Sequence, residues 1–277
     1  MALRSLALRS LGSAWLVLLV LSPAVGQDTA PVASPTPRGD EAALRREAGR
    51  LAATLAARRT QPPRLFMRLE VVVSDLGSLV DRRRTLDVTR VREGGAEALR
   101  IRFRAPASLI GRSLLLRREQ GQELAWRFDR ARQKVEPLAW PKGTQELGGT
   151  GLTWSDLWGP QPGEWRYRLE GEGDLALGES SDAQKVRVLR IRALGPGGVA
   201  RLLHLEHKRR LPLLIDERRR GGERRLVWRS RWKESGEFWI PLRLRIQAAR
   251  ATSRIEVRSF RLQAPSAHLD PSRFMRE

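Results

Sequence analysis

The sequence predicts an α+β fold that consists mainly of an antiparallel β-sheet, and three observations lead to this prediction. An apolar period of about 3.6 residues occurs once, after Asp40, and then gives way to alternation with a period of two. About a dozen alternating segments follow, most of them separated by turns that contain glycine. These spacers are too short for helical crossovers, so neighbouring strands should pair antiparallel.

The first 26 residues predict a secretory signal peptide. Arg4 and Arg9 form a positive n-region, residues 15–21 (WLVLLVL) form an apolar h-region, and Ala24-Val25-Gly26 is a small-x-small cleavage pattern. We therefore expect cleavage after Gly26 and a mature protein in the periplasm. An uncleaved anchor is the weaker alternative, because the apolar run is shorter than the roughly 20 residues that span a bilayer. The chain has no cysteine, which excludes disulfides and a lipobox-type anchor.

Beyond the signal peptide, residues 27–39 are rich in Pro, Ala, Ser and Thr and predict a flexible linker, followed by a single domain at 40–277. The formal net charge is +21, because 52 Lys and Arg residues outnumber 31 Asp and Glu residues. In an exported protein this charge would attract anionic membrane headgroups rather than nucleic acid. A GC-rich coding sequence also favours arginine, so the sequence leaves the role of the charge open.

The helical segment is predicted to be amphipathic. Asp40 can cap its N-terminus, and Pro62-Pro63 ends it. The apolar stripe at helical spacing consists of Leu44, Ala48, Leu51 and Leu55.

The strands that follow should form a curved sheet with two different faces. On one strand Leu99, Ile101 and Phe103 alternate with arginines at 100, 102 and 104, which predicts a dry concave face and a wet convex face. Gly171-Glu172-Gly173 is one of the expected turns. The expected strands lie at 65–73, 84–91, 99–103, 113–118, 123–129, 165–170, 185–194, 200–207, 213–217, 225–232, 240–248 and 254–262.

A glycine-rich segment at 148–160 contains a predicted short helix. Thr153 and Asp156 form a capping-box-like pair, and Gly159-Pro160 stops the helix. Its apolar side chains must cover something apolar, which is either ordinary core or the mouth of a ligand cavity. These side chains are Trp154, Leu157 and Trp158.

The run at 149–157 (GTGLTWSDL) resembles the G-x-x-F-S-Y-x-D-L signature of the outer-membrane lipoprotein-sorting proteins, which have the LolA-like fold. The chain departs from this pattern by its Trp154, where Tyr or Phe is usual, and by its many arginines. Other segments are similar to motifs of that family in the same order: 103–106 (FRAP), 111–116 (GRSLLL), the strand of Trp126 with 134–137 (KVEP), 238–241 (FWIP) and 269–274 (LDPSRF).

The resemblance implies an incomplete β-barrel whose helices cover an apolar cavity for acyl chains. It implies a periplasmic carrier that moves lipid or lipoprotein acyl chains toward the outer membrane, with transient contact to anionic membrane surfaces or a membrane transporter. An envelope sensor of the same fold with a membrane-protein partner is the alternative, since fold alone does not fix function. We expect a lid formed by Trp154, Leu157 and Trp158, and a cavity lined by Met67, Leu69, Val71, Leu99, Ile101, Phe103, Trp126, Phe128, Leu242 and Leu244.

The residues do not predict an enzyme. His204 and His207 lie in a strand-like segment, where their spacing places them on opposite sides rather than at one metal. Ser155 lacks the flanking glycines of a nucleophile elbow, and Asp156 is more simply a capping acid than a general base. A hydrolase is therefore the weaker hypothesis, and we expect no catalytic residues, metal, cofactor or nucleic-acid partner.

Overall fold

The computed structural model describes residues 38–159, 164–177 and 184–262. The predicted signal peptide, most of the predicted linker and the 269–274 motif lie outside the described residues. The long helix begins at Arg38, two residues before the cap expected at Asp40.

Two α-helices, two short 3-10 helices (Ala107–Leu109 and Pro196–Gly198) and thirteen strands make up the described fold. Their bounds are α1 (Arg38–Thr60), β1 (Arg64–Asp75), β2 (Arg82–Glu93), β3 (Ala96–Ala105), β4 (Arg112–Glu119), β5 (Gln122–Asp129), β6 (Lys134–Leu138), α2 (Trp154–Trp158), β7 (Arg166–Leu177), β8 (Gln184–Leu194), β9 (Ala200–Glu206), β10 (Pro212–Arg218), β11 (Arg224–Ser235), β12 (Phe238–Gln247) and β13 (Ala251–Arg261).

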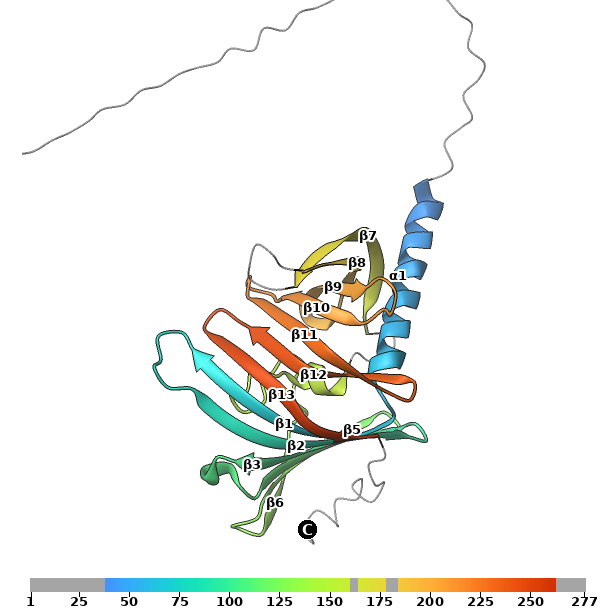
Figure 1. The fold of residues 1–277 in the computed structure, drawn as a ribbon. Helices are drawn as coiled ribbons and strands as arrows, with labels where there is room; N and C mark the ends of the chain where they lie inside the picture. Colours follow the sequence, from blue (N-terminus) through green and yellow to red (C-terminus); the bar gives the residue numbers. More distant parts are fainter. Residues whose placement is uncertain (1–37, 160–163, 178–183, 263–277) are drawn as a thin grey trace, which may run out of the picture. The chain divides into compact units, whose positions relative to one another are not determined.

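All thirteen strands form one antiparallel sheet in the order β6-β5-β4-β3-β2-β1-β13-β12-β11-β10-β9-β8-β7. The sheet consists of two meanders, β1 to β6 and β7 to β13, which join where β1 pairs with β13. The edge strands β6 and β7 do not pair with each other, so the curved sheet stays open. In Figure 1, α2 lies inside the curve and α1 runs along the side formed by β7 to β10. The predicted mainly antiparallel, incomplete barrel with helices is confirmed.

Every expected strand forms. The structure differs from the prediction at two places, one missed strand and one expected turn, and each difference has a physical cause. Sequence reasoning missed β6, because its five residues contain Pro137 and are too few to show a clear alternation. The expected turn at Gly171-Glu172-Gly173 is wrong, since β7 runs through it. The pairing of β7 with β8 shifts between Leu169 and Gly171, so the glycines accommodate a bulge rather than a turn.

The apolar stripe expected to make α1 amphipathic is not its buried face. Leu44, Leu51 and Leu55 are 69%, 52% and 45% exposed. The helix instead turns its smallest residues to the sheet, and these are Gly49, Ala52, Ala53 and Ala56.

The close approach of α1 to β7 explains why small residues form the buried face of the helix. A Cβ atom added to Gly49 would lie 2.7 Å from the backbone nitrogen of Leu169 and 2.8 Å from the carbonyl carbon of Arg168. The helix backbone therefore rests almost directly on the strand backbone, and only residues without bulky side chains fit between them.

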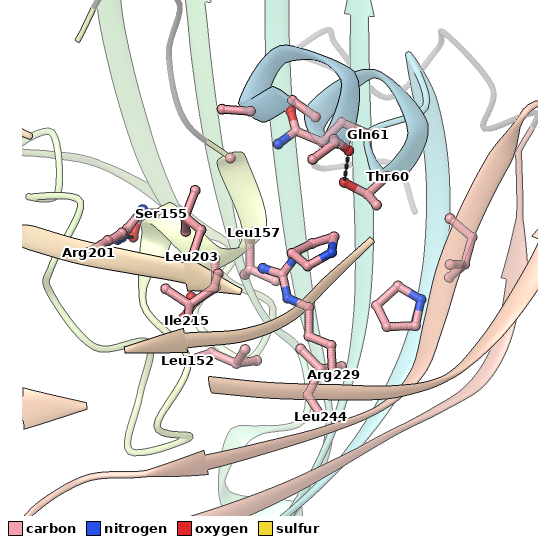
Figure 2. A pocket seen from close by; sticks show the side chains of 18 of the residues that line it. Thr60, Gln61, Leu152, Ser155, Leu157, Arg201, Leu203, Ile215, Arg229 and Leu244 are labelled. Atoms are coloured by element: carbon pink, nitrogen blue, oxygen red, sulfur yellow. Dashed lines mark hydrogen bonds between the residues drawn. The ribbon is translucent and has the colours of Figure 1, made fainter. Parts of the chain in front are cut away.

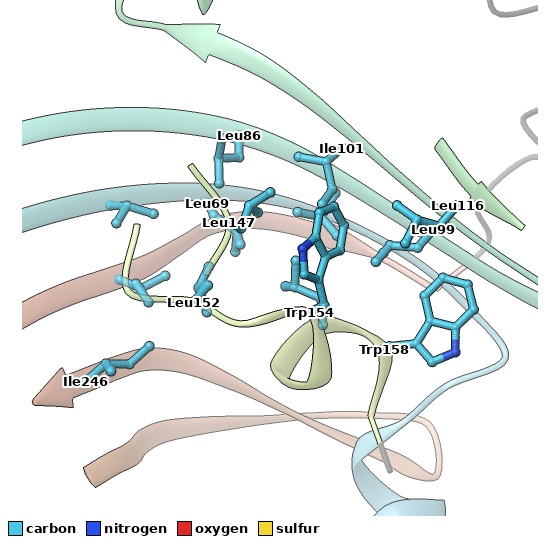
Figure 3. Close-up of a cluster of buried hydrophobic side chains, with 14 of the residues drawn as sticks. Leu69, Leu86, Leu99, Ile101, Leu116, Leu147, Leu152, Trp154, Trp158 and Ile246 are labelled. Atoms are coloured by element: carbon cyan, nitrogen blue, oxygen red, sulfur yellow. The ribbon is translucent and has the colours of Figure 1, made fainter. Parts of the chain in front are cut away.

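The core lies on the concave side of β1 to β4. Leu69, Leu99 and Ile101 pack there against Trp154 of α2 and against Leu147 of the segment before it (Figure 3). The part of the prediction that placed Leu99, Ile101 and Phe103 on a dry concave face is confirmed.

We predict that Gly49→Ala destabilises the protein although alanine favours a helix over glycine by about 1 kcal/mol. The added methyl group meets backbone atoms that cannot move independently, so the free energy of unfolding should fall by about 1–3 kcal/mol. Urea denaturation measures this change, and limited proteolysis reports whether α1 detaches. Leu55→Ala on the exposed stripe is the control, with an expected change within about 0.5 kcal/mol. A Gly49→Ala protein as stable as the parent would contradict the close contact.

Candidate functional site

The concave side of the sheet contains a cavity of about 150 Å³ between the two helices. Small residues of α1 form one wall, among them Ala53 and Ala56, and Leu157 of α2 forms another (Figure 2). Strands from both meanders complete it. Their apolar contributions include Met67, Leu69, Leu203, Leu205, Ile215, Leu244, Ile255 and Val257.

The short helix α2 contributes side chains to both this cavity and the core. Trp154 points toward Leu147 and Ile101, and Trp158 lies beside Leu99 and Leu116 (Figure 3). The Trp158 indole also donates a hydrogen bond of 2.8 Å from Nε1 to Glu97, which fixes the ring. Leu157 faces the other way and lines the cavity.

Asp156 anchors α2 to the sheet through a buried ion pair. Its carboxylate contacts the Arg225 guanidinium of β11, and both side chains are almost fully buried. The same carboxylate accepts a 2.7 Å hydrogen bond from the Thr153 backbone N–H, as expected for the acid of a capping box. Burial alone would raise the pKa of Asp156, but the charge and hydrogen bond of Arg225 outweigh it and hold the pKa below its ordinary value.

A second network holds the neighbouring residue. The Arg201 guanidinium donates to the Ser155 hydroxyl at 2.9 Å and pairs with Glu217 of β10 at 2.7 Å. Glu217 also accepts a 2.9 Å hydrogen bond from Arg219, so its buried carboxylate has two cationic partners. Ser155 is therefore a hydrogen-bond acceptor in a structural network, and the hydrogen-bond partners of its hydroxyl in the described part of the chain are the side chains of Arg201 and Thr153, neither of which is a general base.

Arginines from the other meander bind the end of α2. Arg90 of β2 donates to the Leu157 carbonyl at 3.1 Å, and Arg92 donates to the Trp158 carbonyl. These carbonyls lie at the C-terminal end of the helix, where backbone acceptors lack helical partners and the dipole favours positive charge. Four arginines, Arg90, Arg92, Arg201 and Arg225, therefore tie this five-residue helix to both halves of the sheet.

The structure brings only part of the predicted cavity lining to the cavity. Met67, Leu69 and Leu244 line it. Leu242 is half-buried on β12 but does not contribute to the wall. Four predicted residues pack in the adjacent core instead, and these are Val71, Leu99, Ile101 and Phe103.

Trp126 and Phe128 lie on the opposite face of the sheet. In β5 these residues pair with Leu115 and Ser113 of β4, whereas the concave-facing Leu116 pairs with Ala125. Both aromatics therefore pack in a separate cluster with Ala98 and Leu115. Their predicted place in the cavity is wrong, because the sheet has apolar side chains on both faces here and alternation alone does not identify the inner one.

The short helix that carries the predicted lid residues is confirmed, and it has Thr153 before it and Gly159 after it. Leu157 lines the cavity, and the two indoles belong to the core. Whether α2 moves when a ligand binds stays a prediction.

Sequence reasoning missed the buried and half-buried arginines of the concave face. Arg225 and Arg229 alternate with Val227 on β11, and Val227 is fully buried in the core. The sequence did contain a signal for them. Residues two apart in a strand face the same side, so an arginine two positions from a buried apolar residue points inward, whereas a solvated arginine occupies the positions between such residues. The alanines that line the cavity from α1 were missed for the same kind of reason, because the larger leucines dominate its apolar pattern.

Within the described ranges, no cluster of three or more His, Asp or Glu side chains could hold a metal ion. His204 is half-buried on β9, while His207 lies beyond that strand and contacts Glu172 at 3.0 Å. None of the helices in the described part of the chain is both long enough and apolar enough to cross a membrane.

The fold is similar to that of known crystal structures. A domain classed with the outer membrane lipoprotein-sorting proteins, from Vibrio parahaemolyticus, has 14% sequence identity and a TM-score of 0.69, covering 83% of this chain and 99% of that one. A DUF1329 family protein from Desulfovibrio piger gives the same values. A LolA superfamily protein from Nitrosomonas europaea has 14% identity and a TM-score of 0.61, covering 81% of this chain and 98% of that one.

The sequence matches no protein-family model, and no curated protein matches it significantly. At 14% identity the structural likeness establishes the fold, which is the LolA-like incomplete β-barrel. The likeness expected from the 149–157 run is therefore confirmed at the level of the fold.

We predict that Asp156→Asn strongly destabilises the protein, because it leaves Arg225 buried without its anionic partner. Breaking a buried pair in this way costs about 3–5 kcal/mol. The folded pKa of Asp156 is depressed, so the pair stabilises the protein above the unfolded carboxyl pKa of about 3.9 and loses this effect as the pH falls through the lower folded value. The stability difference between parent and variant should therefore shrink toward acid pH.

Chemical denaturation at pH 7 and at stepwise lower pH measures this difference. Glu41→Gln is the control, because it removes an exposed ion pair with Arg45 on α1 and should leave stability unchanged. A difference between parent and Asp156→Asn that is small at pH 7, or that grows in acid, would contradict the role of the pair.

Proposed function

We propose that this protein is an exported carrier that binds lipid or lipoprotein acyl chains in its concave cavity and moves them toward the outer membrane. The observation that carries the proposal is the cavity itself, whose strand walls are mostly apolar and whose other walls are two helices. Burying an acyl chain there gains about 0.8 kcal/mol per methylene group. Such a carrier shields the tail from water and needs no catalytic group.

We propose that the carrier acts in the periplasm. The support for it is the sequence pattern at residues 1–26, which has the n-, h- and c-regions of a signal peptide with cleavage after Gly26. A lipid tail crossing an aqueous compartment between two membranes is the situation in which a closed apolar cavity is useful.

The cavity of about 150 Å³ is smaller than the roughly 300–1,000 Å³ of typical ligand pockets. A long acyl chain therefore requires a wall to move. α2 is tied down by four arginines, whereas α1 meets the sheet through glycine and alanine and has few large side chains to unpack. We infer that α1 is the wall that yields.

A membrane surface is a proposed partner, and one hairpin has suitable chemistry for it. At the tip between β1 and β2, Leu76, Leu79 and Val80 are 86%, 103% and 72% exposed. The arginine run 82–84 follows directly, and Arg250 of the neighbouring hairpin accepts a 2.8 Å hydrogen bond from the Leu76 N–H through its carbonyl. Apolar side chains beside arginines suit the surface of an anionic bilayer, where the tip enters the headgroups and the cations stay outside.

We predict that protein purified without detergent contains lipid, which mass spectrometry of an organic extract should identify. Leu244→Trp should fill the cavity and strongly reduce the bound lipid while the protein remains folded. The same exchange at the exposed Leu124 of β5 is the control and should leave the lipid content unchanged. Lipid-free parent protein that also fails to bind a fluorescent fatty acid would contradict the carrier function, and a stable complex with a membrane protein would favour the sensor.

We also predict that the protein associates with vesicles that contain anionic lipid, and that association falls with rising salt. Leu79→Ser should weaken it about tenfold, because burial of a leucine side chain contributes about 1.5–3 kcal/mol. Co-sedimentation measures both effects, with Leu124→Ser as the control. Equal association with neutral and anionic vesicles would show that the arginines do not direct the protein to membranes.

A further inference from the structure

The charges around the cavity do not balance. Four arginines point to the concave side near α2, and these are Arg90, Arg201, Arg225 and Arg229. Among the described residues, two buried carboxylates pair with these arginines, Asp156 and Glu217, while the less buried Glu97 acts on Arg90 without forming an ion pair. Arg225 pairs with Asp156 and Arg201 pairs with Glu217, so Arg90 and Arg229 have no carboxylate partner among the described residues.

Arg229 has fewer hydrogen-bond partners than Arg90. Both terminal nitrogens of Arg90 at least reach backbone carbonyls, those of Leu157 and Pro62. Arg229 has no hydrogen bond or ion pair with the described part of the chain, and its Nε atom is buried without an acceptor. In Figure 2 its side chain extends from β11 into the middle of the cavity, toward Leu157.

The strand walls next to Arg229 are mainly apolar. Leu244 lies directly opposite on β12, and Leu203 and Ile215 line the same cavity. Desolvation lowers the pKa of Arg229 from its ordinary value, and the charges of Arg201 and Arg225 add to this effect while Asp156 opposes it. A guanidinium in such a place is costly without an anionic partner, and it gains most from one that accepts two hydrogen bonds, as a carboxylate or a phosphate does.

We propose that the cavity binds an anionic amphiphile, whose carboxylate or phosphate head pairs with Arg229 and whose apolar tail lies along Leu203, Leu205 and Leu244. This inference rests on the proposed carrier function and specifies its ligand class. A purely structural arginine would have a protein acceptor, either a carboxylate, as Arg201 and Arg225 have, or backbone carbonyls, as Arg90 has. The unpaired position of Arg229 inside an apolar wall instead matches a ligand that brings both the anion and the tail.

The test compares ligands that share a tail and differ in the head. Isothermal titration with oleate and with oleyl alcohol measures the preference for an anionic head, and inorganic phosphate measures whether an anion binds without a tail. We expect the parent protein to bind oleate about 10- to 100-fold more tightly than oleyl alcohol, the range of a charged hydrogen-bonded contact. Phosphate alone should bind far more weakly than oleate.

Arg229→Gln should lose the preference for oleate and keep the affinity for oleyl alcohol, while Arg229→Lys should retain part of the preference. Arg231→Gln, an exposed arginine on the same strand, is the matched control and should behave as the parent. Without ligand, Arg229→Gln should melt at the same or a higher temperature than the parent, because it removes an unpaired charge whose Nε atom is buried.

Several results would overturn the proposal. Equal affinity for the two ligands in the parent, or a preference that persists in Arg229→Gln, would show that Arg229 does not bind the head while leaving lipid carriage intact. Phosphate binding as tight as that of oleate would identify a site for a free anion. An Arg229→Gln protein that fails to fold would make Arg229 structural. Failure of both oleyl ligands to bind the parent would overturn the carrier function together with this inference.

Discussion

The buried ion pair between Asp156 and Arg225 is the interaction on which the arrangement of the site depends. A helix of five residues has almost no stability of its own, so contacts with the sheet must hold α2 inside the curve. Asp156 provides one such contact and also caps the helix through the Thr153 N–H. Because α2 is held there, its indoles complete the core and Leu157 forms part of the cavity wall. Core and cavity thus meet at one short element.

The two helices meet the sheet in opposite ways. Polar contacts hold α2, while α1 makes a close backbone approach at Gly49 that excludes large side chains. Polar networks with good geometry give a specific position, whereas packing through glycine and alanine buries little area and separates at a lower cost. We infer from this contrast that α1 is the wall more able to move, as the proposed entry and release of a long tail would require. Under our proposal, Arg229 would add a preference for an anionic head on the ligand.

Sequence reasoning recovered the sheet and the short helix because both leave strong local signals. Alternation marks each long strand, and the Thr153–Asp156 pair with Gly159 marks α2. Sequence reasoning failed where the burial of a side chain depends on a segment that packs against it from elsewhere in the chain. Trp126 and Phe128 alternate as an inward face would, yet pack outside, and the leucines of α1 lie in solvent because β7 approaches Gly49. The buried arginines were missed because charge was assigned to the wet face, although Arg229 shares the phase of Val227.

The most direct test of the central claim is to locate a bound acyl chain. A fatty acid with a photoreactive diazirine on its tail can be crosslinked to the protein and its attachment sites mapped by peptide mass spectrometry. Our account predicts crosslinks on the cavity walls, in peptides that contain Ala53 to Ala57, Leu203 to Leu205 and Leu244. Excess unlabelled oleate should suppress these crosslinks. Attachment mainly to the outer cluster around Trp126 and Phe128, or labelling that excess oleate does not reduce, would contradict the claim that the concave cavity holds the lipid.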